Sequence, residues 1–264
     1  MDEMRLPGGN VGGAIKVGAT VRRPAGRWTP TIQRLLQTLV DAGISEVPRP
    51  LGLDERGREA VSYIPGETVV EDWWPDWSRS EATVRDIGRL MRRLHDASEG
   101  LGEGEVLPWR LTDAAVDAGQ VVCHNDIAPY NIVWRRQTGV VGLIDWDFAS
   151  PGDRRVDLAF ALWQFAPLHH PQLTARLGWP NDVDRLSHAR ALVDAYGLDP
   201  ELRLALPEFI LERMMDLRRT IRRLADEGQT AFQFHIDRGD LDDITKSAEF
   251  VQQLRPSLEE ALTN

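Results

Sequence analysis

The segment HNDIAPYN, residues 124–131, is the stretch from which we predict the fold of this chain. It has the form H-x-D-x-x-x-x-N and directly follows Val121-Val122-Cys123, a short apolar run typical of a buried strand. Asn, Asp and Pro also favour surface turns, so this segment taken alone would be weak support for a functional site. A second acidic segment further along the chain decides between the two interpretations.

That second segment is Ile144-Asp145-Trp146-Asp147, which also follows an apolar run, residues 140–144. Residues 132–134 and 140–144 are predicted to pair as a β-hairpin. The hairpin would bring Asn131 and Asp145 to the same end. Two acidic segments at the ends of strands, correctly ordered, favour a functional site over a surface turn.

These residue types suit phosphoryl transfer from ATP. The transferring group carries heavy negative charge, so catalysis depends on positioning and on neutralisation by Mg²⁺. Mg²⁺ prefers hard oxygen ligands, which the amide of Asn131 and the carboxylate of Asp145 would supply. Asp126 would lie across the metal site and accept the proton of the substrate hydroxyl.

The loop resembles the catalytic loop of protein kinases and, more closely, that of the aminoglycoside-phosphotransferase family. The closer likeness lies in the H-N-D form and in Asp145-Trp146-Asp147, where protein kinases have D-F-G. Residues 150–153, Asp157-Leu158-Ala159 and Leu94-His95 also match, and the likeness covers about residues 5–165. The family is similar to choline, fructosamine and macrolide kinases, so the resemblance indicates the reaction more firmly than the substrate.

The resemblance implies a role for each matching residue. Asp126 would be the catalytic base, and Asn131 and Asp145 would bind the metal, with Asp147 adding a contact to a second metal or to the ligand shell. His124 would brace the loop by hydrogen bonding. Asp157 would anchor the loop backbone from the start of a helix.

The resemblance also implies a bilobal, protein-kinase-like α+β fold. Residues 1–65 read as strands with one helix and would form a small, β-rich nucleotide-binding lobe. Residues 66–264 are mainly helical and would form the larger catalytic and substrate lobe, with the boundary at Pro65-Gly66. The helix of the first lobe is predicted from Thr29, as N-cap, to Gly43.

Glycines near the start of the chain could cover the nucleotide phosphates, because small residues let backbone N–H groups approach oxygen atoms. The glycines concerned are Gly8, Gly9, Gly12 and Gly13, and they could equally form an ordinary turn. The segment is not a Walker A loop, since Ala14-Ile15 follows it rather than Lys-Ser. Backbone groups from Ser62 to Ile64 would face adenine.

One departure from the family concerns the phosphates. The family normally places a lysine on the next strand, paired with a helix glutamate. Here the strand ends in Arg22-Arg23, and the helix contains no glutamate, with Gln33 as its nearest polar candidate. Side chains alternate along a strand, so only one arginine can face the site. We predict Arg23, because Val21 would then share its side and line the nucleotide pocket.

Composition narrows the class of protein. The net charge of −10 argues against general nucleic-acid binding, which needs a basic surface. No secretory leader or membrane-spanning run is visible, and the single cysteine, Cys123, excludes an intrachain disulfide, so a cytoplasmic protein is expected. Residues 1–66 carry a net charge of +2, which would suit an anionic nucleotide, while the acidic remainder would suit a cationic substrate.

The acceptor is the least defined part of the prediction. We expect a hydroxylated small molecule, with a cationic amine such as an antibiotic as one candidate. Two groups of acids could bind it or could be ordinary surface residues: Glu208, Glu212 and Asp216 at helical spacing, and Asp240, Asp242 and Asp243. Trp73, Trp74 and Trp77 could form a lid or cap the core.

Two alternatives to a kinase remain open. A Mg²⁺-dependent phosphohydrolase would use the same carboxylates with water. A catalytically weak or inactive kinase-like binding or immunity protein would hold a nucleotide or a toxic peptide without turnover, and the missing Lys/Glu pair favours it. The sequence leaves open ATP against GTP and the oligomeric state.

Overall fold

The structure is a computed structural model of the 264-residue chain, and it describes residues 3–6, 13–70 and 73–263. The chain divides into two compact units. The first unit combines residues 1–70 with 90–157, and the second combines 71–89 with 158–264. The lobe boundary predicted at residues 65 and 66 remains a proposal.

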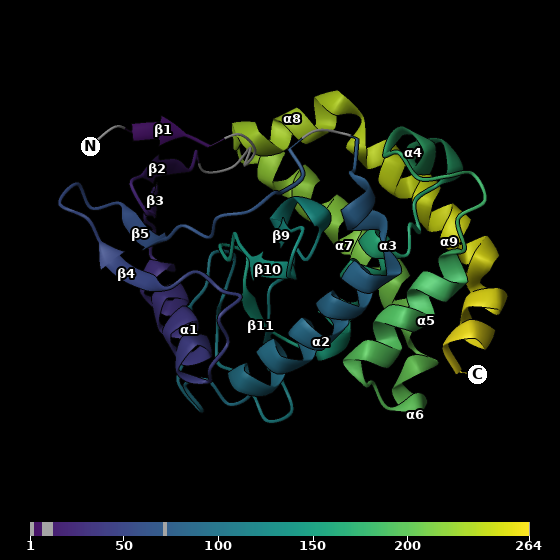
Figure 1. Ribbon diagram of the computed structural model, residues 1–264, viewed down its shortest axis with the longest axis horizontal. Helices are drawn as coiled ribbons and strands as arrows, with labels where there is room; N and C mark the ends of the chain where they lie inside the picture. Colours follow the sequence, from purple (N-terminus) through teal and green to yellow (C-terminus); the bar gives the residue numbers. More distant parts are fainter. Residues whose placement is uncertain (1–2, 7–12, 71–72, 264) are drawn as a thin grey trace. The chain divides into compact units, whose positions relative to one another are not determined.

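The first unit contains a five-stranded antiparallel sheet in the order β1-β2-β3-β5-β4 (Figure 1). The strands are β1 (Glu3–Arg5), β2 (Ile15–Val17), β3 (Thr20–Arg23), β4 (Pro50–Leu53) and β5 (Glu59–Ser62). The chain turns between β2 and β3 at Gly18, whose φ is 59°. The order places β5 directly beside β3, although the two are far apart in sequence.

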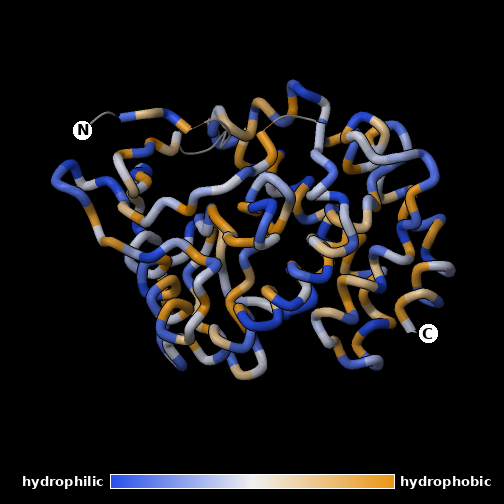
Figure 2. Tube along the Cα trace, in the orientation of Figure 1, coloured by the Kyte–Doolittle hydropathy of each residue, from blue (hydrophilic) through white to orange (hydrophobic). Residues whose placement is uncertain are grey.

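Helix α1 (Thr29–Asp41) packs against β4. Its apolar residues recur at helical spacing, and Ile32, Leu35, Leu36 and Leu39 have no exposed surface. Apolar and polar residues alternate along the helices in Figure 2. The predicted N-cap was wrong by one residue: Trp28 holds that position, and Thr29 already begins the helix, where its hydroxyl accepts a hydrogen bond from the Gly26 N–H.

The predicted hairpin after the loop of residues 124–131 is confirmed. β9 (Ile132–Arg135) pairs antiparallel with β10 (Gly139–Leu143), with a bulge between Val140 and Gly142. β8 (Val121–Cys123) pairs with β11 (Ser150–Gly152), and a short 3₁₀ turn, η2 (Pro129–Asn131), lies between β8 and β9. β6 (Leu107–Pro108) and β7 (Asp113–Ala114) form a further small ladder.

The second unit is helical. It contains η1 (Asp76–Arg79), α4 (Pro171–Arg176), α5 (Arg185–Tyr196), α6 (Pro200–Arg203), α7 (Leu206–Asp226), α8 (Thr230–Arg238) and α9 (Asp240–Thr263). Helices α2 (Glu81–Ser98) and α3 (Arg154–Phe165) include residues of both units. α7 packs against α8 and α9, and α5 against α9. An N-terminal antiparallel sheet with a larger helical C-terminal part is the α+β class predicted from the sequence.

No helix among the described residues combines the length and the apolar character needed to span a bilayer.

Candidate active site

A buried carboxylate anchors the loop of residues 124–131. The two oxygens of Asp157 accept hydrogen bonds from the backbone N–H groups of His124 and Asn125, each at 2.7 Å. His95 Nε2 lies 3.1 Å from the same carboxylate, and Asp157 is only 1% exposed. Burial alone would raise the pKa of Asp157, but the hydrogen bonds that its carboxylate accepts from His95 and from the loop backbone lower the pKa below its usual range. Asp157 therefore holds the loop as a charged acceptor.

The loop backbone is left-handed at Asn125, whose φ is 67°. Asparagine tolerates this conformation better than most residues. Its side-chain amide donates to the Phe148 carbonyl and the Ser150 hydroxyl, both at 2.9 Å. These bonds tie the loop to the segment that follows Asp147.

His124 braces the loop, as predicted. Its Nε2 donates to the Ile144 carbonyl at 3.0 Å, and its ring packs edge-on against Trp146, with ring centroids 4.6 Å apart. Burial lowers the pKa of His124, so the ring is neutral. The histidine thereby connects the two acidic segments.

Both oxygens of the Asp126 carboxylate are hydrogen-bonded. Oδ1 accepts from the Tyr130 hydroxyl at 2.7 Å, and Oδ2 accepts from Asn131 Nδ2 at 2.9 Å. The same Asn131 nitrogen also donates to the Asp126 carbonyl at 2.9 Å. Within the described part of the chain, no donor is recorded for the Asn131 amide oxygen, so this atom is available as a ligand.

Asp145 lies beside Asn131, as the hairpin predicted. The Ile144 N–H donates to the Asn131 carbonyl at 2.9 Å, which places the residue after Ile144 next to the loop. Asp145 has a φ of 65°, and its side chain is 42% exposed. A non-glycine residue in this backbone region is uncommon, although Asp, like Asn, adopts it more readily than most, and such conformations are concentrated at functional sites.

Arg23, and not Arg22, faces these acids. Arg23 Nη1 donates to Asp145 Oδ1 at 2.9 Å, and Nη2 lies 3.2 Å from Asp147 Oδ1. Arg22 points to the other side of the sheet and pairs with Asp54. Burial opposes the charge on Arg23, but the surrounding carboxylates raise its pKa above the usual range. As the alternation argument predicted, Arg23 is the arginine that lies beside Asp145 and Asp147, and its contact with phosphate remains a prediction.

A third acid at this cluster, Glu59, was missed by the sequence analysis. It opens β5 directly across from Arg23, is 2% exposed, and accepts from Arg23 Nη2 at 2.8 Å. Gln33 of α1 donates to its other oxygen at 2.8 Å. A glutamate at the head of the apolar run Ala60-Val61 is the signal that could have indicated a buried, paired acid.

Arg110 was also missed. Its Nη1 donates to Asp147 Oδ2 at 2.8 Å, and its guanidinium stacks on the rings of Trp28 and Phe148 at 4.7 and 4.8 Å. Asp147 therefore faces two arginines. Burial raises the pKa of Asp147 above its usual range, and Arg23 and Arg110 act in the opposite direction.

The predicted nucleotide residues are only partly described. Gly8, Gly9 and Gly12 lie outside the described residues, while Gly13 has a φ of 59°. Ser62 ends β5, and its backbone N–H donates to the Arg49 carbonyl. Ile64 packs on Gly142 of β10, where a side chain would come within 2.9 Å of Ile64 Cδ1. A contact of Ser62 or Ile64 with adenine remains a prediction.

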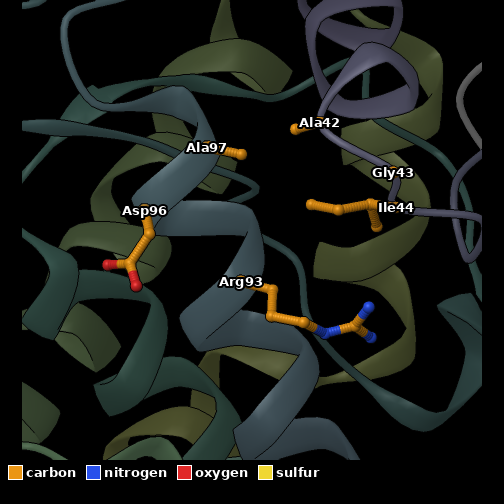
Figure 3. Close-up of a pocket in the computed structure, with 6 residues that line it drawn as sticks. All are labelled: Ala42, Gly43, Ile44, Arg93, Asp96 and Ala97. Carbon is orange, nitrogen blue, oxygen red and sulfur yellow. The ribbon is translucent and has the colours of Figure 1, made fainter.

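Two other features of this unit lie apart from Asp126, Asn131 and Asp145. A surface pocket of about 450 Å³ is lined by residues following α1 and by α2, as Figure 3 shows, and it includes none of them. Among the described residues, His95, Cys123 and Asp157 have atoms close enough to share a metal ion. Because Asp157 already accepts the two loop N–H groups, we assign that cluster to anchoring the loop.

In the second unit, most of the candidate acids are engaged by basic side chains. Glu208 pairs with Arg255 at 2.7 Å, and Asp240 and Asp243 accept from a histidine and an arginine each. Trp74 is 4% exposed, whereas Trp73 is 62% exposed. Trp74 thus belongs to the core, as one of the two interpretations expected.

Comparisons with known proteins agree with the fold. The model of the phosphotransferase enzyme family matches residues 101–185, which include the loop of residues 124–131 and the Asp145 segment. A trifolitoxin immunity protein from Rhizobium leguminosarum bv. trifolii is 37% identical over 207 residues, covering 76% of this chain and 77% of that protein. The chain belongs to the phosphotransferase enzyme family.

Solved structures show the same kinase-like fold at low identity. An amicoumacin kinase in complex with AMP-PNP and Ca²⁺ is 14% identical with a TM-score of 0.61, over 97% of this chain and 88% of that one. A choline/ethanolamine kinase family protein from Mesorhizobium loti is 17% identical with a TM-score of 0.56, and the match covers 100% of this chain and 92% of that one. An aminoglycoside 2'-phosphotransferase-IIIa bound to GDP is 14% identical with a TM-score of 0.53, and the match covers 97% of this chain and 93% of that one.

Proposed function

We propose that this protein is an ATP- and Mg²⁺-dependent small-molecule kinase that transfers the γ-phosphate of ATP to a substrate hydroxyl. The observation that carries the proposal is the linked arrangement of Asp126, Asn131 and Asp145 in one compact unit, with Arg23 bonded to Asp145. Family membership supports the same class of reaction.

Asp126 is the proposed catalytic base. Its Oδ1 already accepts from a hydroxyl, that of Tyr130, so the carboxylate is oriented to take a proton from an O–H group. Its hydrogen bond from Asn131 fixes the carboxylate plane. The acceptor oxygen would then attack the γ-phosphorus as its proton passes to Asp126, while the bond from the γ-phosphorus to the β–γ bridging oxygen breaks and ADP leaves.

Asn131 and Asp145 are the proposed metal ligands, with Asp147 as a further contact. The available amide oxygen of Asn131 and the exposed carboxylate of Asp145 fit a hard divalent cation. Asp147 fits less simply, because both of its oxygens face arginines. The chemistry that a bound Mg²⁺ supplies is neutralisation of the phosphate charge.

The proposed nucleotide contacts come from the sheet. Arg23 would hold phosphate oxygens, Gly8, Gly9, Gly12 and Gly13 would cover them, and backbone groups of Ser62 and Ile64 would face adenine. A guanidinium suits this role because its planar fork matches phosphate oxygens. The analogue AMP-PNP and Ca²⁺ bound to the amicoumacin kinase support a nucleotide and a divalent cation here.

The proposed acceptor is a hydroxylated small molecule, with a cationic antibiotic as one candidate, and the proposed location is the cytoplasm. The relative named as a trifolitoxin immunity protein favours a second candidate function, a catalytically weak or inactive kinase-like immunity protein that holds a nucleotide or a toxic peptide without turnover. Both candidates connect the protein to resistance against an antibacterial compound. They differ in whether phosphate is transferred.

The first test is thermal stabilisation by ATP, ADP and GTP with and without Mg²⁺, in the wild type and in Asp145→Ala. A ligand present at 100 times its Kd stabilises the native state by about 2.7 kcal/mol, which gives a measurable shift of the melting temperature. A shift that requires both Mg²⁺ and Asp145 supports the kinase, and hydroxylated amines are then screened as acceptors. The absence of a shift with every nucleotide would contradict the proposal and favour the immunity protein. Phosphate release without any acceptor would indicate the phosphohydrolase.

A further inference from the structure

One edge of the Arg23 guanidinium is held by Glu59. Arg23 Nε and Nη2 both donate to Glu59 Oε2, at 3.2 and 2.8 Å. The remaining nitrogen, Nη1, donates to Asp145 at 2.9 Å. A guanidinium is planar, with its N–H groups in a fixed fork, so holding one edge determines where the other edge points.

Glu59 is itself fixed in place. It is 2% exposed and stands directly across from Arg23 in the pairing of β3 with β5. Its second oxygen, Oε1, accepts from Gln33 Nε2 at 2.8 Å. A buried carboxylate is tolerated only when it is paired and hydrogen-bonded, so Glu59 has little freedom to leave Arg23.

Gln33 extends this arrangement into α1 and β4. Its side-chain oxygen accepts from the Gly52 N–H at 2.8 Å, and its nitrogen also lies 3.4 Å from the Ala60 carbonyl. The helix therefore contributes an amide to the cluster, and the carboxylate comes from the sheet. A continuous series of hydrogen bonds runs from Gly52 through Gln33 and Glu59 to Arg23.

We infer that Glu59, supported by Gln33, is a positioning residue that aims the Nη1 edge of Arg23 at the phosphate oxygens of the nucleotide. The inference rests on the proposed function, because it takes Asp145 as the metal side of the nucleotide site. Glu59 acts through Arg23 and touches no substrate. The cation and its carboxylate are built into neighbouring strands, so their pairing follows from the sheet register.

The test is the Kd of Mg·ATP, measured by calorimetry, for Glu59→Gln, Arg23→Gln and the double variant. We expect Glu59→Gln to weaken binding roughly 10-fold, on the order of one hydrogen bond to a charged group. In the Arg23→Gln background, Glu59→Gln should have no further effect, because the group it positions is gone. The ion pair between Arg22 and Asp54 offers a matched control, because it joins the same types of side chain on the opposite side of β3. The variants Arg22→Gln and Asp54→Asn should bind Mg·ATP with the wild-type Kd.

The inference would be overturned if Glu59→Gln left the Kd of Mg·ATP unchanged. It would also be overturned if Glu59→Gln weakened binding as much in the Arg23→Gln background as in the wild type. If circular dichroism shows that Glu59→Gln does not fold, Gln33→Leu takes its place, with an Arg23-dependent weakening expected and an unchanged Kd again overturning it. Wild-type protein that fails to bind Mg·ATP would refute the proposed function and this inference together. Binding by the wild type that weakens in Asp145→Ala but not in Glu59→Gln would refute the inference alone.

Discussion

Replacing Asp157 by asparagine should lower the free energy of unfolding by about 3 kcal/mol and loosen the loop of residues 124–131. Asp157 accepts the N–H groups of His124 and Asn125 at 2.7 Å each, in a site that is 1% exposed. Asparagine keeps one acceptor oxygen, and its NH₂ group would face the second N–H. One buried donor then loses its partner, which costs about 1–3 kcal/mol, and the remaining bond loses its ionic component.

Urea unfolding, followed by circular dichroism, measures this loss of unfolding free energy. In a thermal scan the same loss corresponds to a decrease of the melting temperature by roughly 6–12 °C. Hydrogen exchange should also accelerate at the amides of residues 124 and 125. Asp96→Asn is the matched control, because Asp96 makes a solvent-exposed ion pair with Arg92 that should contribute less than about 1 kcal/mol. If the free energy of unfolding of Asp157→Asn lay within about 1 kcal/mol of the wild-type value, the proposed anchoring role of Asp157 would be refuted.

Three further predictions concern catalysis and pH. Asp126→Ala should abolish phosphate transfer while changing the Kd of Mg·ATP by less than about two-fold, because a base that takes the acceptor proton does not bind the nucleotide. Equal losses of phosphate transfer and of affinity for Mg·ATP would count against that role. Tyr130→Phe removes the hydroxyl bonded to Asp126 Oδ1 and should raise ADP release in the absence of an acceptor, since water can then reach this oxygen; unaltered ADP release would show that Tyr130 does not shield the base. Burial lowers the pKa of His169 to about 3. Between about pH 6.5 and 3, this histidine is therefore protonated in the unfolded state but not in the folded state. This contribution to stability is complete above pH 6.5 and falls by about 2 kcal/mol between pH 7 and 5, and His169→Gln should remove that slope in unfolding experiments.

The catalytic loop and its neighbouring hairpin could be predicted because their contacts are local. Asn131 contacts Asp126 five residues away, and β9 and β10 are joined by a short turn. Strand alternation was sufficient to choose Arg23 over Arg22, because that choice depends only on the side of one strand. The roles assigned to these residues remain predictions.

The partners of Arg23 and Asp147 could not be predicted in the same way. Glu59 pairs with Arg23 only because β5 lies beside β3 in the sheet order and in one particular register. Arg110 follows β6 in a segment without helical or strand periodicity, so no pattern indicated that it would stack on Trp28 and Phe148. Which distant residues meet depends on packing between elements that the chain does not join.

The sequence by itself determined the class of protein and the positions of the candidate groups, because the proposed base, the two proposed oxygen ligands and the β9–β10 hairpin lie within 22 residues, from residue 124 to 145. Only the tertiary structure decided how those groups are held. Asp157 anchors the loop from 31 residues after Asp126, and Glu59 lies 36 residues after Arg23. Buried charges must find partners wherever the fold supplies them, and strand order and register determine which partners are available.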